Sequence, residues 1–371
     1  MSGMGGVGKT QIALEYVYRY HIEYKVIWWV GADTNETLLQ SANEFIKRDA
    51  PKKRKNTSED IASLFRHWFE NNPNWMIIYD NVDDFELIVP YLPKKMNGNI
   101  IFTTRLSNVS DIYGEMVDVD SLNKNTAIEF LEKRTKIQDK ENAGLLADRL
   151  GYLPLALEQA GAYIRETPNT DYVRYLSLLQ NHDLDVLKQN EKITDYEQTI
   201  ITTWVISANK IKERSALQLL YLCSYFAPDD IELYFFTNAA EYLCHPLKEE
   251  ITNELKRDNI LRELTKYSLV KYENEKLHVH RLLQEATRSQ QNNNGLDMAL
   301  RIIWEALPTA ERDDLYYYAN HNQEDFIRYL SHAEFIAGFA MNTPQKTERR
   351  LENIANIYQI IATRLPCAKR L

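Results

Sequence analysis

The chain has 371 residues but few cysteines, little glycine and no long apolar run. Its three cysteines, Cys223, Cys244 and Cys367, are too few and too scattered for a disulfide framework or a four-ligand metal site. No stretch approaches the roughly eighteen apolar residues of a membrane-spanning helix, and the N-terminus lacks the apolar segment of a signal peptide. We therefore expect a cytoplasmic protein with no membrane partner. The net charge of −9 argues against DNA as a partner.

The scarcity of glycine makes one cluster conspicuous, because four of the twelve glycines fall within six residues. The run fits the phosphate-binding pattern G-x-x-x-x-G-K-[ST] and consists of Gly3, Met4, Gly5, Gly6, Val7, Gly8, Lys9 and Thr10. Without a Cβ atom, glycine lets successive backbone N–H groups turn toward a phosphate. The helix expected next begins with Gln11 and directs its positive dipole end to the same point. The alternative is a flexible tail that contains glycines by chance.

The last two residues of this run predict the chemistry of the site. Lys9 supplies a positive charge for the terminal phosphates of a nucleoside triphosphate, and Thr10 supplies a hydroxyl for Mg²⁺. Short apolar runs alternate with helical patterns downstream, which predicts an α/β domain with a parallel sheet covered by helices. The strands are expected at residues 25–30, 75–80 and 99–103, with a weaker one at 116–119.

Polar residues stand where the predicted strands end, which is the ligand-binding edge of a parallel sheet. Asp80 is placed to hold Mg²⁺, although an acid there can also cap the next helix. Asn81 follows where many triphosphatases have a second acid, and an amide cannot take a proton from water. We therefore expect slow hydrolysis. Asp83 and Asp84 are expected to point elsewhere, since a helix begins there.

Arg105 follows the next predicted strand and is expected at the same edge of the sheet as Asp80. Its guanidinium is placed to reach the γ-phosphate, and a surface arginine is the alternative. From about residue 125 the pattern is helical, with a break at Gly151 and a new helix whose first turn holds Pro154. Two short strands near residues 268–279 and a helix from His280 predict a winged-helix module. His280 either contacts a β-phosphate or simply begins its helix.

These landmarks in this order resemble the NB-ARC family of the signal-transduction ATPases with numerous domains (STAND). The matching stretches are residues 3–10, 75–84, 100–105 and 150–157, the last reading Leu-Gly-Tyr-Leu-Pro-Leu-Ala-Leu. The following Glu158-Gln159-Ala160-Gly161 and the later Thr202-Thr203-Trp204 are similar to the branch with a tetratricopeptide (TPR) sensor. Val279-His280-Arg281 stands where that family has Met-His-Asp, so only the histidine carries over.

The resemblance implies a signalling switch that binds ATP and ADP with Mg²⁺. Its ADP form would be closed, and its ATP form would open and self-associate. Pro154 would pack on the adenine, and His280 would bind the ADP β-phosphate. A protein ligand would bind the C-terminal helical repeats. The alternatives are a nucleotide-gated winged-helix transcription regulator, for which the helix from His280 has few basic residues, and a non-functional gene fragment.

The expected organisation is a nucleotide-binding domain (residues 1–137), a helical ARC subdomain (138–192), a winged-helix domain (193–292) and the start of TPR-like repeats (293–371). Only Met1 and Ser2 precede the phosphate-binding loop. We therefore expect the first strand of the sheet to be missing, and the chain to be truncated at both ends. Losing a central strand leaves backbone groups unpaired, at about 1–3 kcal/mol each if buried.

Overall fold

The computed structural model describes residues 1–49, 58–106, 114–189, 195–289, 295–307, 323–343 and 348–364. The chain forms two compact units. Unit 1 comprises Met1–Asp120, Leu307–Glu334 and Ala355–Leu371, and unit 2 comprises Ser121–Ala306 and Phe335–Ile354. The four-part division given by the sequence remains a prediction. Within the described ranges, no helix combines the length and apolar character needed to cross a bilayer.

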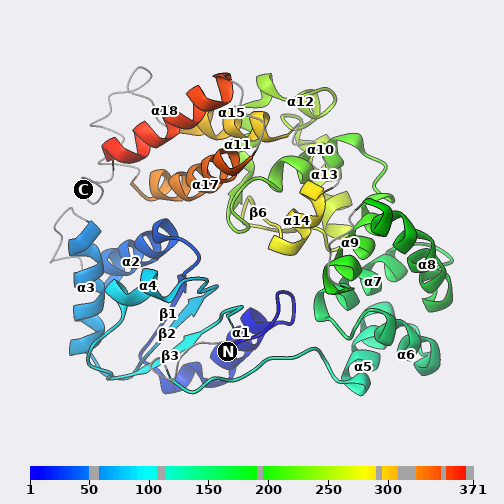
Figure 1. The fold of residues 1–371 in the computed structure, drawn as a ribbon, viewed down its shortest axis with the longest axis horizontal. Helices are drawn as coiled ribbons and strands as arrows, with labels where there is room; N and C mark the ends of the chain where they lie inside the picture. The colour runs from blue at the N-terminus through cyan, green and yellow to red at the C-terminus, as the bar shows by residue number, and fades with distance from the viewer. Residues whose placement is uncertain are drawn as a thin grey trace. The chain divides into compact units, whose positions relative to one another are not determined.

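Unit 1 is built on a parallel sheet, as predicted. The strands are β1 (Val26–Gly31), β2 (Trp75–Asp80) and β3 (Asn99–Phe102), and they lie side by side in that order. Helices α2 (Asn35–Asp49) and α3 (Ser58–Asn71) cover one face, and α1 (Lys9–Tyr20) covers the other (Figure 1). Short helical turns complete the unit: η1 (His21–Glu23), α4 (Phe85–Ile88) and η3 (Val89–Tyr91). The central strand β2 is buried along its whole length.

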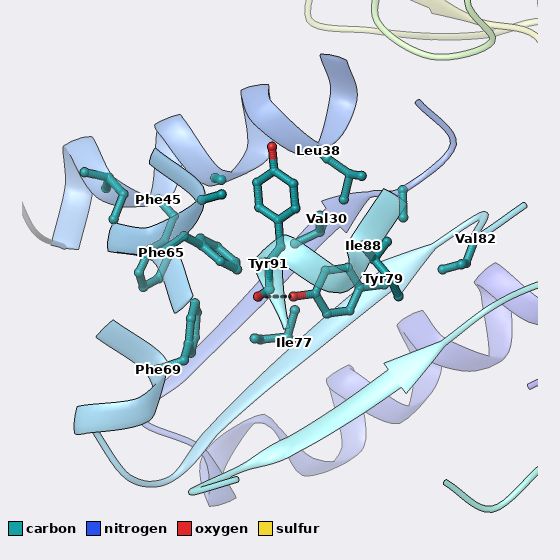
Figure 2. Packing of buried hydrophobic residues seen from close by; sticks show 14 of the residues in the cluster. Val30, Leu38, Phe45, Phe65, Phe69, Ile77, Tyr79, Val82, Ile88 and Tyr91 are labelled. Atoms are coloured by element: carbon teal, nitrogen blue, oxygen red, sulfur yellow. Dashed lines mark hydrogen bonds between the residues drawn. The ribbon is translucent and has the colours of Figure 1, made fainter. Parts of the chain in front are cut away.

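The larger core of unit 1 lies between the sheet and helices α2 and α3 (Figure 2). Phe45 of α2 is fully buried, and its ring packs 4.6 Å from Phe69 and 5.3 Å from Phe65, measured between centroids. The hydroxyl of Tyr79 on β2 donates to the backbone carbonyl of Tyr91 at 3.0 Å, which satisfies the polar end of a buried ring. This core fixes β2, and therefore the edge at which Asp80 lies.

The first two residues form no strand of their own, as expected, but they bridge neighbouring segments of unit 1 through backbone hydrogen bonds. The amino group of Met1 donates to the carbonyl of Phe102 at 2.6 Å, and the Thr104 N–H donates to the Met1 carbonyl at 3.0 Å. On the other side, Ser2 forms an isolated parallel bridge with Asp118. In the described part of the chain, that bridge takes the place of the predicted fourth strand. Met1 and Ser2 thus hold the start of the phosphate-binding loop between two segments of unit 1.

Unit 2 is mainly helical. It contains a small antiparallel sheet of order β4-β6-β5, in which Asn274 and Glu275 make the turn of the hairpin at positive φ. Its elements match the order predicted for a winged helix, and that assignment remains a prediction. The elements are α5 (Lys124–Thr135), α6 (Lys140–Arg149), α7 (Pro154–Glu166), α8 (Tyr172–Gln189), α9 (Asp195–Ala208), α10 (Arg214–Cys223), β4 (Ile231–Glu232), α11 (Leu233–Asn238), η5 (Ala240–Tyr242), α12 (Leu247–Glu250), α13 (Glu254–Lys266), β5 (Lys271–Glu273), β6 (Lys276–His278), α14 (Arg281–Ser289) and α15 (Leu296–Ala306).

Two longer helices follow in the C-terminal part of the chain, as the helical pattern of the sequence predicts. They are α17 (Gln323–Asn342) and α18 (Glu348–Arg364). Arg350 on α18 forms a two-pronged ion pair with Asp297 on α15, with N···O distances of 2.6 and 3.0 Å. The Arg350 residue is 5% exposed, so this pair joins α18 to α15 in a partly desolvated setting.

We predict that Phe45→Ala lowers the free energy of unfolding by about 3–5 kcal/mol, because it removes a ring surrounded by other aromatic rings. Urea denaturation followed by tryptophan fluorescence measures the change. Tyr18→Ala is the matched control, since this side chain is 68% exposed and its loss should have little effect. Equal midpoints for the two variants would contradict the assigned core.

We also predict that Gly3→Ala destabilises unit 1, on the order of 2 kcal/mol. A Cβ at this position would lie 2.2 Å from the carbonyl oxygen of Val119, a backbone atom, and φ is +152°. Gly338→Ala is the control, because its Cβ would meet nothing within 4 Å in the middle of α17, so a helix-favouring residue should stabilise slightly. Thermal unfolding measures both variants: the unfolding temperature should fall in Gly3→Ala and rise slightly in Gly338→Ala.

Candidate functional site

The phosphate-binding loop leads directly into α1. Gly8 is the N-cap residue with φ of 98°, a conformation that strains any residue with a Cβ, and no side chain caps the helix. The first turn of α1 contains no acidic residue. Uncapped N–H groups together with the helix dipole favour an anion at this end of α1.

Lys9 is buried at the start of α1, with 8% of the residue exposed. Its ammonium donates to the carbonyl of Gly3 at 2.7 Å and to that of Met4 at 2.8 Å, so the side chain folds back over the loop. Burial lowers the pKa of Lys9, and the charge of Arg105 lowers it further, while Asp80 and Asp83 raise it. A phosphate at this place would offset both the desolvation and the repulsion from Arg105.

The structure brings Thr10 and Asp80 together, although they are far apart in the sequence. The Thr10 hydroxyl lies 3.0 Å from Asp80 Oδ1 and 3.2 Å from Oδ2. Asp80 ends β2 and is 7% exposed, so its charge depends on such donors. A hydroxyl and a carboxylate are hard oxygen ligands of the kind that Mg²⁺ prefers, and this donor set therefore fits that ion.

Thr103 is a second partner of the Asp80 carboxylate, and the sequence did not indicate it. Its hydroxyl donates to Asp80 Oδ1 in a short hydrogen bond, and it accepts the backbone N–H of Asn81 at 2.9 Å. This contact follows from the parallel register of β2 and β3. Tyr79 pairs with Phe102, so the residues that follow them, Asp80 and Thr103, are neighbours. Predicting it requires the register, which the sequence alone does not fix.

The two acids after Asn81 behave differently from each other. Asp84 is the N-cap of α4 and accepts the N–H of Glu86 at 2.9 Å, so it faces its own helix as predicted. The negative charge of Asp83 raises the pKa of Lys9, and the direction expected for the Asp83 side chain remains a prediction. Asn81 adopts φ of 62°, a left-handed conformation that asparagine tolerates better than most residues.

The remaining predicted site residues occupy surface or second-unit positions. Gln11 and Arg105 are exposed, and Met4 is 50% exposed. Pro154 is the first residue of α7 in unit 2, where its missing N–H costs no hydrogen bond, as predicted. His280 is exposed and precedes α14 in the same unit, and its Nδ1 accepts the N–H of Leu282 at 3.3 Å. The ligand-binding roles of all these residues remain predictions.

Two stretches of the chain match known protein families. Residues 1–141 match the family described as NB-ARC domain, and residues 206–296 match a domain of unknown function (DUF7779). A curated relative is the nucleotide-binding leucine-rich repeat (NLR)-like protein of Hyaloscypha variabilis, which is 24% identical over 95% of this chain and 38% of its own length. The chain thus spans well under half of that relative.

A solved structure with a similar fold is a STAND protein with a tetratricopeptide repeat sensor from Pyrococcus horikoshii. It is 17% identical and aligns over 98% of this chain and 50% of its own length, with a TM-score of 0.53. At this identity the likeness concerns the fold alone. Residues 1–141 therefore match the NB-ARC domain family, and the fold of the chain is similar to that of this STAND protein.

Proposed function

We propose that this chain binds ATP and ADP with Mg²⁺ and acts as a nucleotide-controlled signalling switch. The observation that carries the proposal is the meeting of an uncapped, glycine-rich helix start with Thr10 and Asp80 at one sheet edge. Backbone N–H groups of the loop, from Gly5 to Thr10, would surround the phosphates, and the Lys9 ammonium would neutralise them.

Thr10 and Asp80 are the residues that would hold Mg²⁺. When bound, the ion would neutralise phosphate charge and orient the phosphate chain. The Thr10 hydroxyl has lone pairs for a cation while its proton points to Asp80, so the hydrogen bond seen here and cation binding are compatible. Arg105 would reach the γ-phosphate and report its presence.

Slow hydrolysis is part of the proposal. Asn81 can orient a water molecule but cannot accept its proton, so the residue most favourably placed after Asp80 supplies no general base. A slow enzyme keeps its triphosphate state for a long time, which suits a switch better than a metabolic ATPase. Binding and turnover are therefore separate properties of this site.

The wider mechanism follows the resemblance to the NB-ARC family. ADP would hold the protein closed, with Pro154 on the adenine and His280 on the β-phosphate, and ATP would open it for self-association. A protein ligand would bind the helical C-terminal part. The alternative of a DNA-binding regulator has little support, because Arg288 on α14 donates to the Ser224 carbonyl and stacks 5.0 Å over Phe339.

We predict that protein purified under native conditions carries bound adenine nucleotide and that Lys9→Ala removes it, since the variant loses the buried ammonium beside the phosphates. Chromatography of the supernatant after denaturation identifies and quantifies the nucleotide. Lys25→Ala is the matched control, because this lysine precedes β1 at the opposite end of that strand from Gly31, the partner of Asp80. A folded wild-type protein that neither carries nor takes up nucleotide would refute the proposal.

We also predict that the assembly state depends on the nucleotide. Light scattering coupled to size-exclusion chromatography should give a larger mass with a non-hydrolysable ATP analogue than with ADP. Lys9→Ala should give the same mass with both ligands. An unchanged mass in wild-type protein saturated with either nucleotide would contradict the switching part of the proposal and leave nucleotide binding in place.

A further inference from the structure

The hydroxyl of Thr103 lies between β2 and β3 at the edge that carries Asp80. Thr103 directly follows β3, is fully buried, and stands beside Asp80 in the parallel register. A hydroxyl with no exposure needs defined partners, because burying it unpaired costs free energy. Its two partners are the carboxylate of Asp80 and the backbone of Asn81.

The direction of these two hydrogen bonds is fixed by chemistry. The N–H of Asn81 can only donate, so it occupies a lone pair of the Thr103 oxygen, and the hydroxyl proton is directed to Asp80. The left-handed conformation of Asn81 is part of this arrangement, since its φ of 62° orients the backbone immediately after Asp80.

The backbone of Thr103 is itself held in place. Its N–H donates to the carbonyl of Tyr79 at 3.0 Å, and its carbonyl accepts the N–H of Val82 at 2.8 Å. Both partners flank the segment that contains Asp80. The backbone that carries the Thr103 hydroxyl is therefore fixed beside the segment that contains Asp80.

We propose that Thr103 is a positioning residue for Mg²⁺ binding, which it promotes by fixing the orientation of the Asp80 carboxylate toward Thr10. This inference rests on the proposed function. Thr103 would not touch the ion or the nucleotide; it would limit rotation of the Asp80 carboxylate through a charge-assisted hydrogen bond. Groups that orient metal ligands in this way typically change metal affinity by about 10- to 100-fold when they are removed.

The test compares nucleotide affinity in Mg²⁺ and in EDTA, with a fluorescent ADP analogue as the probe. Thr103→Val keeps the size and branching of the side chain but removes the donor. We expect the ratio of the two affinities to fall by about tenfold in Thr103→Val, with the affinity in EDTA close to that of the wild type. Thr103→Ser restores the hydroxyl and should restore the ratio.

Thr104→Val is the matched control within the same segment. Thr104 is also buried, with 3% exposure, and its hydroxyl accepts the N–H of Leu106 at 3.0 Å instead of contacting Asp80. Losing this hydroxyl should leave the ratio of affinities unchanged. An equal fall of the ratio in Thr104→Val would overturn the specific role of Thr103.

Two further outcomes would overturn the inference while nucleotide binding stands. These are a folded Thr103→Val protein with the wild-type ratio, and an equal loss of affinity in both buffers. If Thr103→Val does not fold, Thr103→Cys keeps the volume with a weaker donor; a lowered ratio supports the inference and a wild-type ratio refutes it. Wild-type protein that binds no analogue in either buffer would refute the proposed function, and the inference with it.

Discussion

A carboxylate at the buried end of the central strand is costly unless donors surround it, and this constraint organises the candidate site. Asp80 receives a hydroxyl from α1 through Thr10 and another from the end of β3 through Thr103. These two donors come from two segments on either side of β2, so the hydrogen bonds that stabilise the charge also align the phosphate-binding loop with the sheet edge. A divalent cation would meet an already assembled set of oxygen atoms.

Other contacts in unit 1 hold the sheet edge and the phosphate-binding loop in place. The aromatic core around Phe45 and Phe65 fixes the sheet from one side, and β2 is buried throughout. At the start of the chain, backbone hydrogen bonds join Met1 to Thr104 and join Ser2 to Val117 and Val119. In the proposed function, Asn81 would separate binding from turnover, because it would leave the cation ligands intact and place an amide where a general base would act.

Much of this arrangement could be predicted from the sequence. The loop pattern predicts Lys9 and Thr10, and an acid after an apolar run predicts Asp80, because these signals are local. Thr103 and the influence of Asp83 on Lys9 depend on strand register and loop conformation, which no local pattern encodes. The pairing of Met1 and Ser2 was missed for a similar reason. Two residues are too few to show a strand pattern in the sequence, yet their backbone groups can bridge two neighbouring segments of the chain.

Calorimetric titration of ADP into nucleotide-free protein, with Mg²⁺ and without it, shows whether Asp80 holds the cation when the wild type is compared with Asp80→Asn. The amide of this variant keeps the size of the side chain but carries no charge for a cation. We expect saturable binding by the wild type that Mg²⁺ strengthens, and binding by Asp80→Asn that Mg²⁺ leaves unchanged. Equal strengthening by Mg²⁺ in both proteins would contradict a site built around Asp80.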